Sequence, residues 1–388
     1  MHDSHAEVIA RRALVRYLLA HARLALIDDG PLHPSSIFDT APSSRNEGES
    51  ETSGKRLLRL KAGIKLHFFV SQMPCGDACV VSEGGSGTGA KEVTRGPDQG
   101  AIISAPSQSD VDAGRQLTGR ARRKPGRGEP TSSMSCSDKI AKWVLLGPQG
   151  ALLSHLLEGP VPIHSITILG EAAAAGSAAR EEARKAAKRA LVDRTAMVAE
   201  SIGRNGGLCN VAPAVDVVAR EAIAEILGSQ AQRMLEGLAA DERRKSKSGV
   251  SINWSALHYY SDSARGSGTF GEVHEVTLSA SGRKAGASKR LRTGEVFNPK
   301  VVPTISRYAV LQSFRDLVAS LLPPEEGESE GVFDKEWKSY GDLKRGLGTD
   351  YYRNWERMRT LERSIFSYWI TKADTEVVSV SAVSAGLV

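Results

Sequence analysis

The feature that most constrains this fold is a strand-like run that passes directly into a proline and a cysteine. The run IKLHFFVSQ (residues 64–72) is largely apolar, and the next residues, MPCGDAC, place Pro74 and small side chains where a helix can start. A second run of this kind, IHSITIL (163–169), is also flanked by segments with helical spacing. Strands that alternate with helices predict an α/β fold.

Helical spacing of apolar residues predicts helices at both ends of the chain. Such spacing is found over 6–26, over 135–159 with a break near Gly147, and near 303–322 and 350–369. The first of these helices begins beside the earliest motif of interest, and the second begins at SCSDK. Candidate functional residues are therefore concentrated at helix starts.

Shifts in composition predict three inserts within one domain. Residues 33–55 are rich in Pro, Ser and acids, and residues 82–115 in Gly, Ser, Asp and Ala. These two segments are typical of a solvated loop and of disorder, whereas the Ala, Glu, Lys and Arg of 171–205 indicate an exposed helix or flexible insert. A chain of 388 residues, 40% hydrophobic, can bury an adequate core. We expect a single domain over residues 1–380.

Composition excludes several classes of protein. Fifty-one basic against 45 acidic residues leave a net charge of +6, which fits a polyanionic partner without requiring one. The four cysteines are too few for a disulfide framework, so we expect reduced thiols in the cytoplasm or nucleus. No apolar run approaches the ~18 residues of a membrane span, and the first residues do not resemble a signal peptide. We expect a soluble intracellular protein, and nothing indicates an obligatory protein partner.

Three expected helix starts carry side chains that can bind zinc. His5 and Glu7 begin the first helix, Cys75 follows Pro74, and Cys136 begins the SCSDK helix. Alone, the histidine–x–glutamate triplet means little, because chance supplies about one in a chain of this composition. A hydrolytic zinc site needs three protein ligands, an open position for water and a base that is not a ligand. His5, Cys75 and a second cysteine would supply the ligands, with Glu7 as the base.

The third ligand is either Cys79 or Cys136. Zinc-dependent nucleobase deaminases space two cysteines as P-C-x-x-C, but here three residues separate Cys75 from Cys79. In a helix, Cys79 would lie a full turn beyond Cys75. That spacing does not clearly allow both sulfur atoms to form short bonds to one ion. We favour Cys136, and we expect Cys79 and Cys209 to be ordinary small buried residues.

Together the motifs resemble the catalytic domain shared by tRNA-specific and duplex-RNA adenosine deaminases. The similar segments are DSHAEVIARRALVRYLL, SQMPCGDA, KPGRGEPTSSMSCSDKIAKWVLLGPQGALLSHLL and GRKAGASK. They cover residues 3 to about 170 and, more weakly, about 250–372. The resemblance implies a cytidine-deaminase-like mixed sheet flanked by helices, with long inserts and a helical carboxyl-terminal part. It also implies that the domain lacks its usual first residues, as if the gene model began at an internal methionine.

The resemblance further implies a zinc-dependent hydrolytic deaminase. Its zinc ligands would be His5, Cys75 and Cys136, and Glu7 would be the proton shuttle that converts adenosine to inosine. The expected substrate is tRNA, at the adenosine 3′ to the anticodon of alanine tRNA, with Lys124 and Arg127 of the KPGRGEP loop touching RNA. An unpaired anticodon-loop base is easier to flip than a paired one.

Three alternatives remain at this point: a catalytically weak or silent RNA-binding relative, a deaminase of duplex or messenger RNA, and a deaminase of free nucleosides. The first is disfavoured because silence usually follows loss of a ligand or of the glutamate, and all four residues are retained. The second is disfavoured because no segment resembles a duplex-RNA-binding domain. The third would favour a compact chain with P-C-x-x-C.

A second implication of the resemblance is a buried inositol hexakisphosphate beneath the zinc centre. A buried polyanion would compensate cations that are otherwise unfavourable to bury. The residues at matching positions are Arg11, Arg12, Lys139, Lys142, Lys289, Tyr340, Lys344, Trp369 and Lys372.

Overall fold

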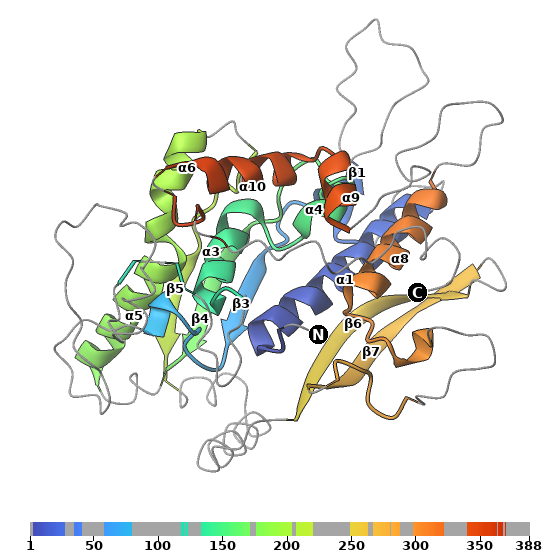
Figure 1. The fold of residues 1–388 in the computed structure, drawn as a ribbon, viewed down its shortest axis with the longest axis horizontal. Coiled ribbons are helices and arrows are strands. Elements are labelled where there is room, and N and C mark those ends of the chain that lie inside the picture. Colours follow the sequence, from blue (N-terminus) through green and yellow to red (C-terminus); the bar gives the residue numbers. More distant parts are fainter. Residues whose placement is uncertain are drawn as a thin grey trace, which may run out of the picture.

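The structure is a computed structural model that combines helices with small sheets, which confirms the α/β class (Figure 1). No helix among the described residues is long and apolar enough to cross a membrane. The structure describes residues 3–27, 35–40, 58–79, 118–119, 121–122, 133–170, 176–203, 207–219, 249–262, 267–279, 281–287, 298–321, 340–362, 364–367 and 369.

The elements alternate between strands and helices in the first half of the chain and are mainly helical at its end. The strands are β1 (Phe38–Thr40), β2 (Leu58–Leu60), β3 (Leu66–Val70), β4 (Ile163–Leu169), β5 (Ala214–Val218), β6 (Val250–Asp262) and β7 (Ser267–Leu278). The helices are α1 (Ala6–Ile27), α3 (Cys136–Leu146), α4 (Gly150–Leu153), α5 (Ser177–Leu191), α6 (Ala196–Ile202), α8 (Arg307–Ala319), α9 (Tyr340–Gly346) and α10 (Asp350–Thr360), with 3-10 turns η2 (Asp77–Cys79), η4 (Asp193–Thr195) and η5 (Pro299–Val301).

The sheet that positions the site is parallel, in the order β3–β4–β5. β4 coincides with the expected strand 163–169, and its Ile166 and Ile168 are fully buried. Parallel strands need crossover connections, usually helical, and such sheets are covered on their faces. Here α3 and α5 pack their apolar side chains into one core with these strands.

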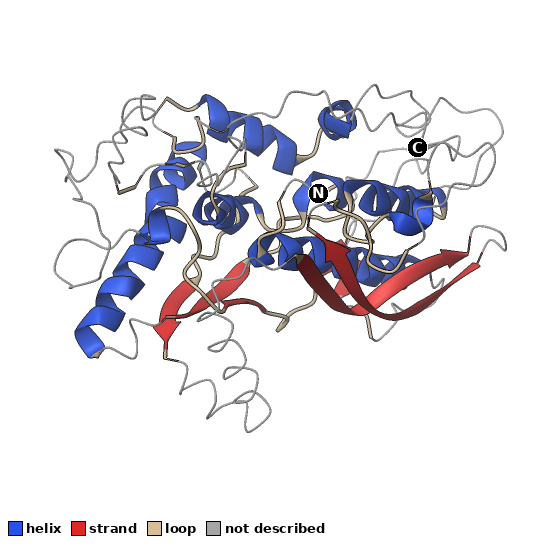
Figure 2. Ribbon diagram, turned by 60° about the horizontal axis from the view of Figure 1, so that its bottom comes forward, coloured by secondary structure: helices blue, strands red, loops and turns tan. Residues whose placement is uncertain are grey.

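The remaining described strands form two antiparallel pairs, β1 with β2 and the long β6 with β7. Among the described residues, the strands thus form one parallel sheet and two antiparallel ribbons, flanked by helices. Helix α1 lies along β6, and Figure 2 shows the β6–β7 ribbon beneath the helices, apart from the parallel sheet. The buried residues of α1 from Val15 onward share a second core with β1, β2, α4, α8 and α9.

Two expected inserts differ from the structure where it describes them. The expected loop at 33–55 contains β1, whose Phe38 is fully buried. The expected exposed or flexible insert at 171–205 contains α5, which packs Ala183, Ala187 and Ala190 into the core of the parallel sheet. An alanine face lets the helix approach the sheet closely, while charged residues such as Lys185 and Lys188 remain exposed. The expected insert at 82–115 lies outside the described residues.

Candidate metal centre and adjoining cavity

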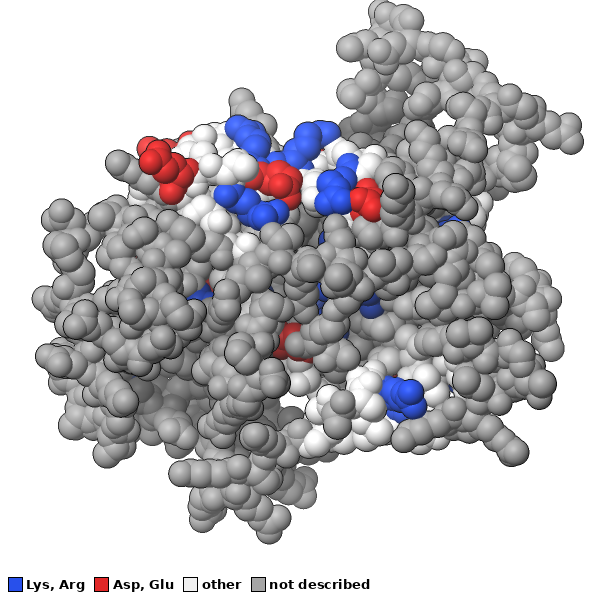
Figure 3. Space-filling model, in the orientation of Figure 1, with Lys and Arg blue, Asp and Glu red and all other residues white. Residues whose placement is uncertain are grey.

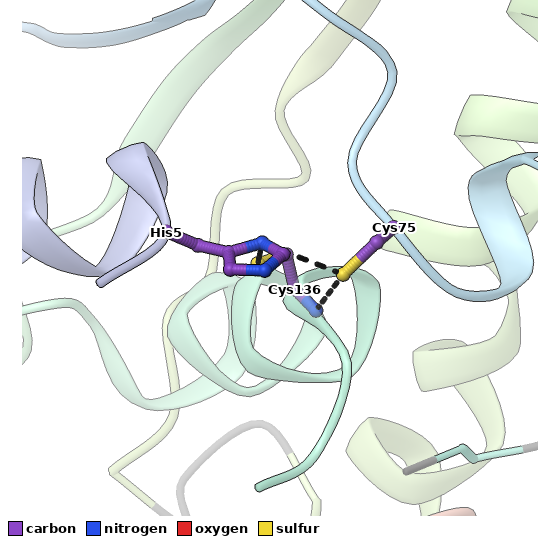
Figure 4. A group of neighbouring side chains, drawn as sticks. All are labelled: His5, Cys75 and Cys136. Atoms are coloured by element: carbon purple, nitrogen blue, oxygen red, sulfur yellow. Dashed lines mark hydrogen bonds between the residues drawn. The ribbon is translucent and has the colours of Figure 1, made fainter. Parts of the chain in front are cut away.

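Three side chains from distant parts of the sequence meet at one point (Figure 4). His5 precedes α1, Cys75 follows β3, and Cys136 is the first residue of α3. Their ligand atoms all lie within 4.8 Å of one another. His5 Nδ1 is 3.4 Å from Cys136 Sγ and 3.8 Å from Cys75 Sγ. One histidine nitrogen and two thiolates are a donor set that suits zinc.

The start of α3 is fixed by its own sequence. Ser135 is the N-cap, and its hydroxyl accepts a hydrogen bond from the backbone N–H of Asp138. The backbone N–H of Cys136 donates to Cys75 Sγ over 3.3 Å, so the Cys75 sulfur lies at the amino end of α3. The helix dipole that favours its thiolate therefore belongs to α3. The sequence predicts a separate helix that starts at Pro74 and Cys75, but the structure has only the short turn η2 (Asp77–Cys79) there among the described residues.

Ser137 and Gly76 join the two cysteine segments. The Ser137 hydroxyl lies 3.0 Å from the Cys75 carbonyl oxygen and accepts from the Ala78 N–H at 3.2 Å, and the Ser137 backbone N–H donates to Cys75 O. Gly76 has φ +108°, and a Cβ there would lie 2.2 Å from Ser135 Oγ. A larger residue would therefore separate the two thiol-bearing segments.

The surroundings of Cys75 favour the ionised form of its thiol. Its hydrogen bond with Cys136 is the largest of the contributions that lower its pKa to about 4, and the His5 ring adds to it while burial opposes it. Metal ligands must be deprotonated to bind. A thiolate at neutral pH suits Cys75 to that role.

The other two cysteines are separate from this group. Cys79 Sγ donates to the Pro74 carbonyl oxygen at 3.2 Å, and the residue is exposed, not buried as expected. Cys209 is half-buried, and burial raises the pKa of its thiol to about 12. Among the described residues, neither belongs to a group that could hold a metal.

Glu7 lies in the first turn of α1, two residues after His5, and is half-buried. Desolvation of the Cys79 sulfur, together with the charges of Cys75 and Glu7, raises the pKa of the Cys79 thiol to about 11. Glu7 thus acts on the Cys79 thiol through its charge and lies outside the ligand group.

A cavity of about 450 Å³ adjoins the metal centre. Asp3 links the two: it lines the cavity, and its Oδ1 accepts the backbone N–H of His5 at 3.1 Å. Its Oδ2 contacts Lys139 and accepts from Ser133 Oγ at 3.0 Å. Seven of the nine residues expected at a polyanion site line this cavity: Arg11, Arg12, Lys139, Lys142, Tyr340, Lys344 and Trp369.

The cavity lining is strongly cationic. Sequence reasoning missed three of its arginines: Arg307 begins α8, and Arg345 and Arg359 lie in the last turns of α9 and α10, where a cation by itself is only a weak signal. Among the described lining residues, eight cations face two carboxylates, Asp3 and Glu356. The cations are Arg11, Arg12, Lys139, Lys142, Arg307, Lys344, Arg345 and Arg359.

Burial and mutual repulsion act on these cations. Burial, and then the charges of Lys344, Arg11 and Arg359, hold the pKa of Lys142 well below its usual value. Lys142 Nζ lies 3.3 Å from the ring centre of Trp355, a cation–π contact that only partly replaces an anion. The cavity thus favours a bound negative group.

Four expected contact residues lie outside the described part of the chain: Lys289 and Lys372 of the polyanion set, and Lys124 and Arg127 of the basic loop. The described surface gives no uniform basic patch in their place on the face shown in Figure 3. There, basic and acidic side chains are interspersed over α10. On that helix Arg353 and Asp350 form an exposed ion pair.

Comparison with known proteins shows which family the chain belongs to. The family model of the adenosine-deaminase (editase) domain matches residues 1–373. Human tRNA-specific adenosine deaminase 1 is 25% identical over 467 aligned positions, which cover 95% of this chain and 82% of the human protein.

Two fruit-fly (Drosophila melanogaster) proteins match a shorter segment more closely. Its tRNA-specific adenosine deaminase 1 is 36% identical over 169 residues, and its double-stranded RNA-specific editase Adar is 33% identical over 170. Each match covers 43% of this chain but only 38% and 23%, respectively, of the fly proteins. The family model nevertheless spans nearly the whole chain. This protein therefore belongs to the adenosine-deaminase (editase) domain family.

Proposed function

We propose that this chain hydrolytically deaminates adenosine in RNA to inosine. The observation that carries the proposal is the meeting of His5, Cys75 and Cys136 at the start of α3, with Glu7 two residues after His5 in the first turn of α1 and outside the ligand group. Membership of the editase family supports the reaction. Retention of all four residues argues against the silent relative that we considered as an alternative.

The donor set fits one zinc ion, held by His5, Cys75 and Cys136. When bound, zinc would acidify the water that attacks carbon 6 of adenine. Glu7 would accept a proton from that water and deliver it to ring nitrogen 1; it would then take the remaining hydroxyl proton at carbon 6 and pass it to the amino group, which leaves as ammonia while the carbonyl of inosine forms. Asp3 would hold the backbone of His5 through the Oδ1 bond, which keeps the imidazole next to the thiols.

We propose tRNA as the substrate, at the adenosine 3′ to the anticodon of alanine tRNA. Named tRNA-specific relatives that match 95% of the chain support the tRNA class. Lys124 and Arg127 would contact phosphates beside the flipped base, because their loop leads into the segment that carries Cys136. Duplex or messenger RNA remains the second candidate, since duplex-RNA deaminases also match this chain.

We propose inositol hexakisphosphate as a structural group in the cavity. Six phosphates would match the eight cationic side chains of the described lining, which have only two carboxylates among them. Lys289 and Lys372 would add to this set. We also propose one catalytic domain over residues 1–380, working in the cytoplasm or nucleus, where the ligand thiols stay reduced.

The test is deamination by zinc-loaded protein of three substrates: total tRNA, a perfect RNA duplex and free adenosine. We expect inosine in alanine tRNA only, read as adenosine-to-guanosine changes on sequencing. The Glu7→Gln variant should keep its zinc and lose about 10²- to 10⁴-fold in rate. Editing of the duplex with untouched tRNA would refute the tRNA assignment, and wild-type protein that holds zinc without deaminating any substrate would refute the activity.

A further inference from the structure

Each cysteine of the metal centre is followed, two residues later, by a buried aspartate. After Cys75, the carboxylate of Asp77 is fully buried. Its Oδ1 accepts the backbone N–H of Gly119 at 2.6 Å, and its Oδ2 lies 3.3 Å from Arg189 Nε. Arg189 also donates to the Asp77 backbone oxygen at 2.9 Å. One guanidinium thus holds both the side chain and the main chain beyond Cys75.

The same arrangement recurs after Cys136. Asp138 is 1% exposed, and its Oδ1 forms a 2.7 Å ion pair with Arg194, which is buried as well. Its Oδ2 accepts the Ser135 hydroxyl at 2.6 Å and the backbone N–H of Arg122 at 2.8 Å. Asp138 therefore holds the N-cap that sets where α3, and with it Cys136, begins.

Both arginines come from one continuous element. Arg189 lies in the last turn of α5 and Arg194 in η4, which follows directly. The alanine face of α5 packs into the core of the parallel sheet, so the element is anchored independently of the cysteines. Gly119 and Arg122 likewise come from one short segment. The two cysteine segments are thus clamped between the same pair of elements.

We infer that Arg189 and Arg194 are positioning residues of the metal centre: by clamping Asp77 and Asp138 they set the separation and orientation of the Cys75 and Cys136 thiols. The inference rests on the proposed role of these thiols as zinc ligands. Neither arginine touches the reacting atoms. Outer groups that orient metal ligands change metal affinity or activity about 10- to 100-fold when they are altered.

Lysine is the informative replacement. It keeps the positive charge that a buried carboxylate requires, but it has no planar fork and cannot reproduce the two bonds of Arg189 to Asp77. Arg184→Lys is the matched control, since Arg184 lies on the same helix and pairs with the exposed Glu181 at 2.7 Å. A general effect of lysine on α5 would appear in all three variants.

The experiment compares metal binding by the full chain in wild type, Arg189→Lys, Arg194→Lys and Arg184→Lys, without RNA. Metal-free protein is titrated with Co²⁺, whose visible and thiolate charge-transfer bands report ligand geometry. Zinc dissociation constants are measured against a chelator, and circular dichroism checks the fold. We expect about 10- to 100-fold weaker zinc binding and altered cobalt bands in Arg189→Lys and Arg194→Lys, with wild-type behaviour in Arg184→Lys.

Wild-type zinc affinity and cobalt bands in either folded clamp variant would overturn the inference. If Arg194→Lys does not fold, Arg189→Lys decides alone, because Arg189 is 27% exposed and tolerates change better than the buried Arg194. Equal weakening in Arg184→Lys would also overturn it. Failure of the proposed function is distinguishable: wild type would bind metal and the clamp variants would weaken it, yet no substrate would be deaminated.

Discussion

The metal centre and the cationic cavity meet at Asp3, yet they balance charge in opposite ways. Around the metal centre, the buried carboxylates of Asp77 and Asp138 each face an arginine and a backbone N–H from the same chain. In the cavity, eight described cations face two carboxylates. Buried charges need compensation. The described residues around the metal centre pair their buried carboxylates with cations, whereas those that line the cavity have more cations than carboxylates, which is why we propose a bound anion there.

We expect the largest effect from a substitution that disrupts the metal centre and leaves the cavity intact. Cys136→Ala removes a ligand from a three-residue set, so we expect complete loss of zinc and of deamination. The inositol phosphate released on denaturation should stay at the wild-type amount. Elemental analysis and an inositol phosphate assay of one preparation check both.

Cys79→Ala is the control for this prediction. Its sulfur donates to the Pro74 carbonyl oxygen and lies outside the ligand group, so the variant should keep its zinc. Zinc loss confined to Cys79→Ala, or equal in the two variants, would show that the ligand set is misassigned.

The second prediction breaks the cavity and leaves the metal centre intact. Lys142→Met removes a cation whose pKa is depressed by burial and by Lys344, Arg11 and Arg359. A hydrogen bond to a charged group contributes about 1.5–3 kcal/mol, so affinity for inositol hexakisphosphate should fall about 10- to 100-fold. The ligand-free protein should be no less stable than wild type, because a repelled cation is gone.

Thermal melts of ligand-stripped protein, with and without added inositol hexakisphosphate, measure both effects. Lys185→Met on α5 is the control, since Lys185 is exposed and pairs with Glu182. A ligand-induced rise in Tm as large in Lys142→Met as in wild type would place the anion elsewhere. Zinc content should not change in either variant.

The third prediction concerns Arg16, a buried cation that contacts a neutral histidine. It is intermediate between the paired charges of the metal centre and the excess cations of the cavity. Arg16 NH2 lies 2.9 Å from His258 Nε2 between α1 and β6. Burial, then Arg16 and Lys284, lower the pKa of His258 to about 3. Between pH 6.5 and 3 the His258 ring is protonated in the unfolded chain but stays neutral in the native protein. The free energy of unfolding therefore falls as the pH falls through this window.

Urea unfolding at pH 7 and pH 5 checks this direction. We expect His258→Gln to reduce the loss of stability between the two values, because the titrating ring is gone. The exposed His67→Gln should keep the wild-type loss. An unchanged loss in His258→Gln would mean that other groups carry the acid sensitivity, such as His21, whose pKa burial lowers to about 4.

The residues that could bind the metal were easier to predict from the sequence than the residues that hold them in place. His5, Cys75 and Cys136 stand out because few side chains bind zinc, and the structure gathers these three. Strand β4 and the break between α3 and α4 were also predicted, because apolar runs and a Gly-Pro pair are local signals. Such features need no knowledge of distant contacts.

The residues and elements that hold the metal centre in place depend on contacts between residues that are distant in the sequence. Asp77 and Asp138 each follow a cysteine by two positions, a signal that is present in the sequence, but their arginines are 112 and 56 residues away. The alanines of α5 at 183, 187 and 190 have helical spacing, yet the many charges around them indicated exposure. Strand β5 was missed because AVDVV is short and carries an aspartate. Tertiary packing decided these cases.

The smallest expected effect separates cations that bind RNA from cations that pair with acids. Lys124→Ala removes a proposed phosphate contact, so the slope of log affinity against log salt should fall by about one. Arg353→Ala is the control: Arg353 and Asp350 are both more than 60% exposed and pair at 2.5 Å, so removing the arginine should leave tRNA affinity and its salt slope as they are. Filter-binding of alanine tRNA over 50–200 mM salt measures both. A reduced slope in Arg353→Ala with none in Lys124→Ala would move the RNA-binding surface from the loop before Cys136 to α10. The cavity beneath α10 would then lie close to bound RNA. The cavity cations, and not only the residues near the metal centre, would in that case take part in RNA binding.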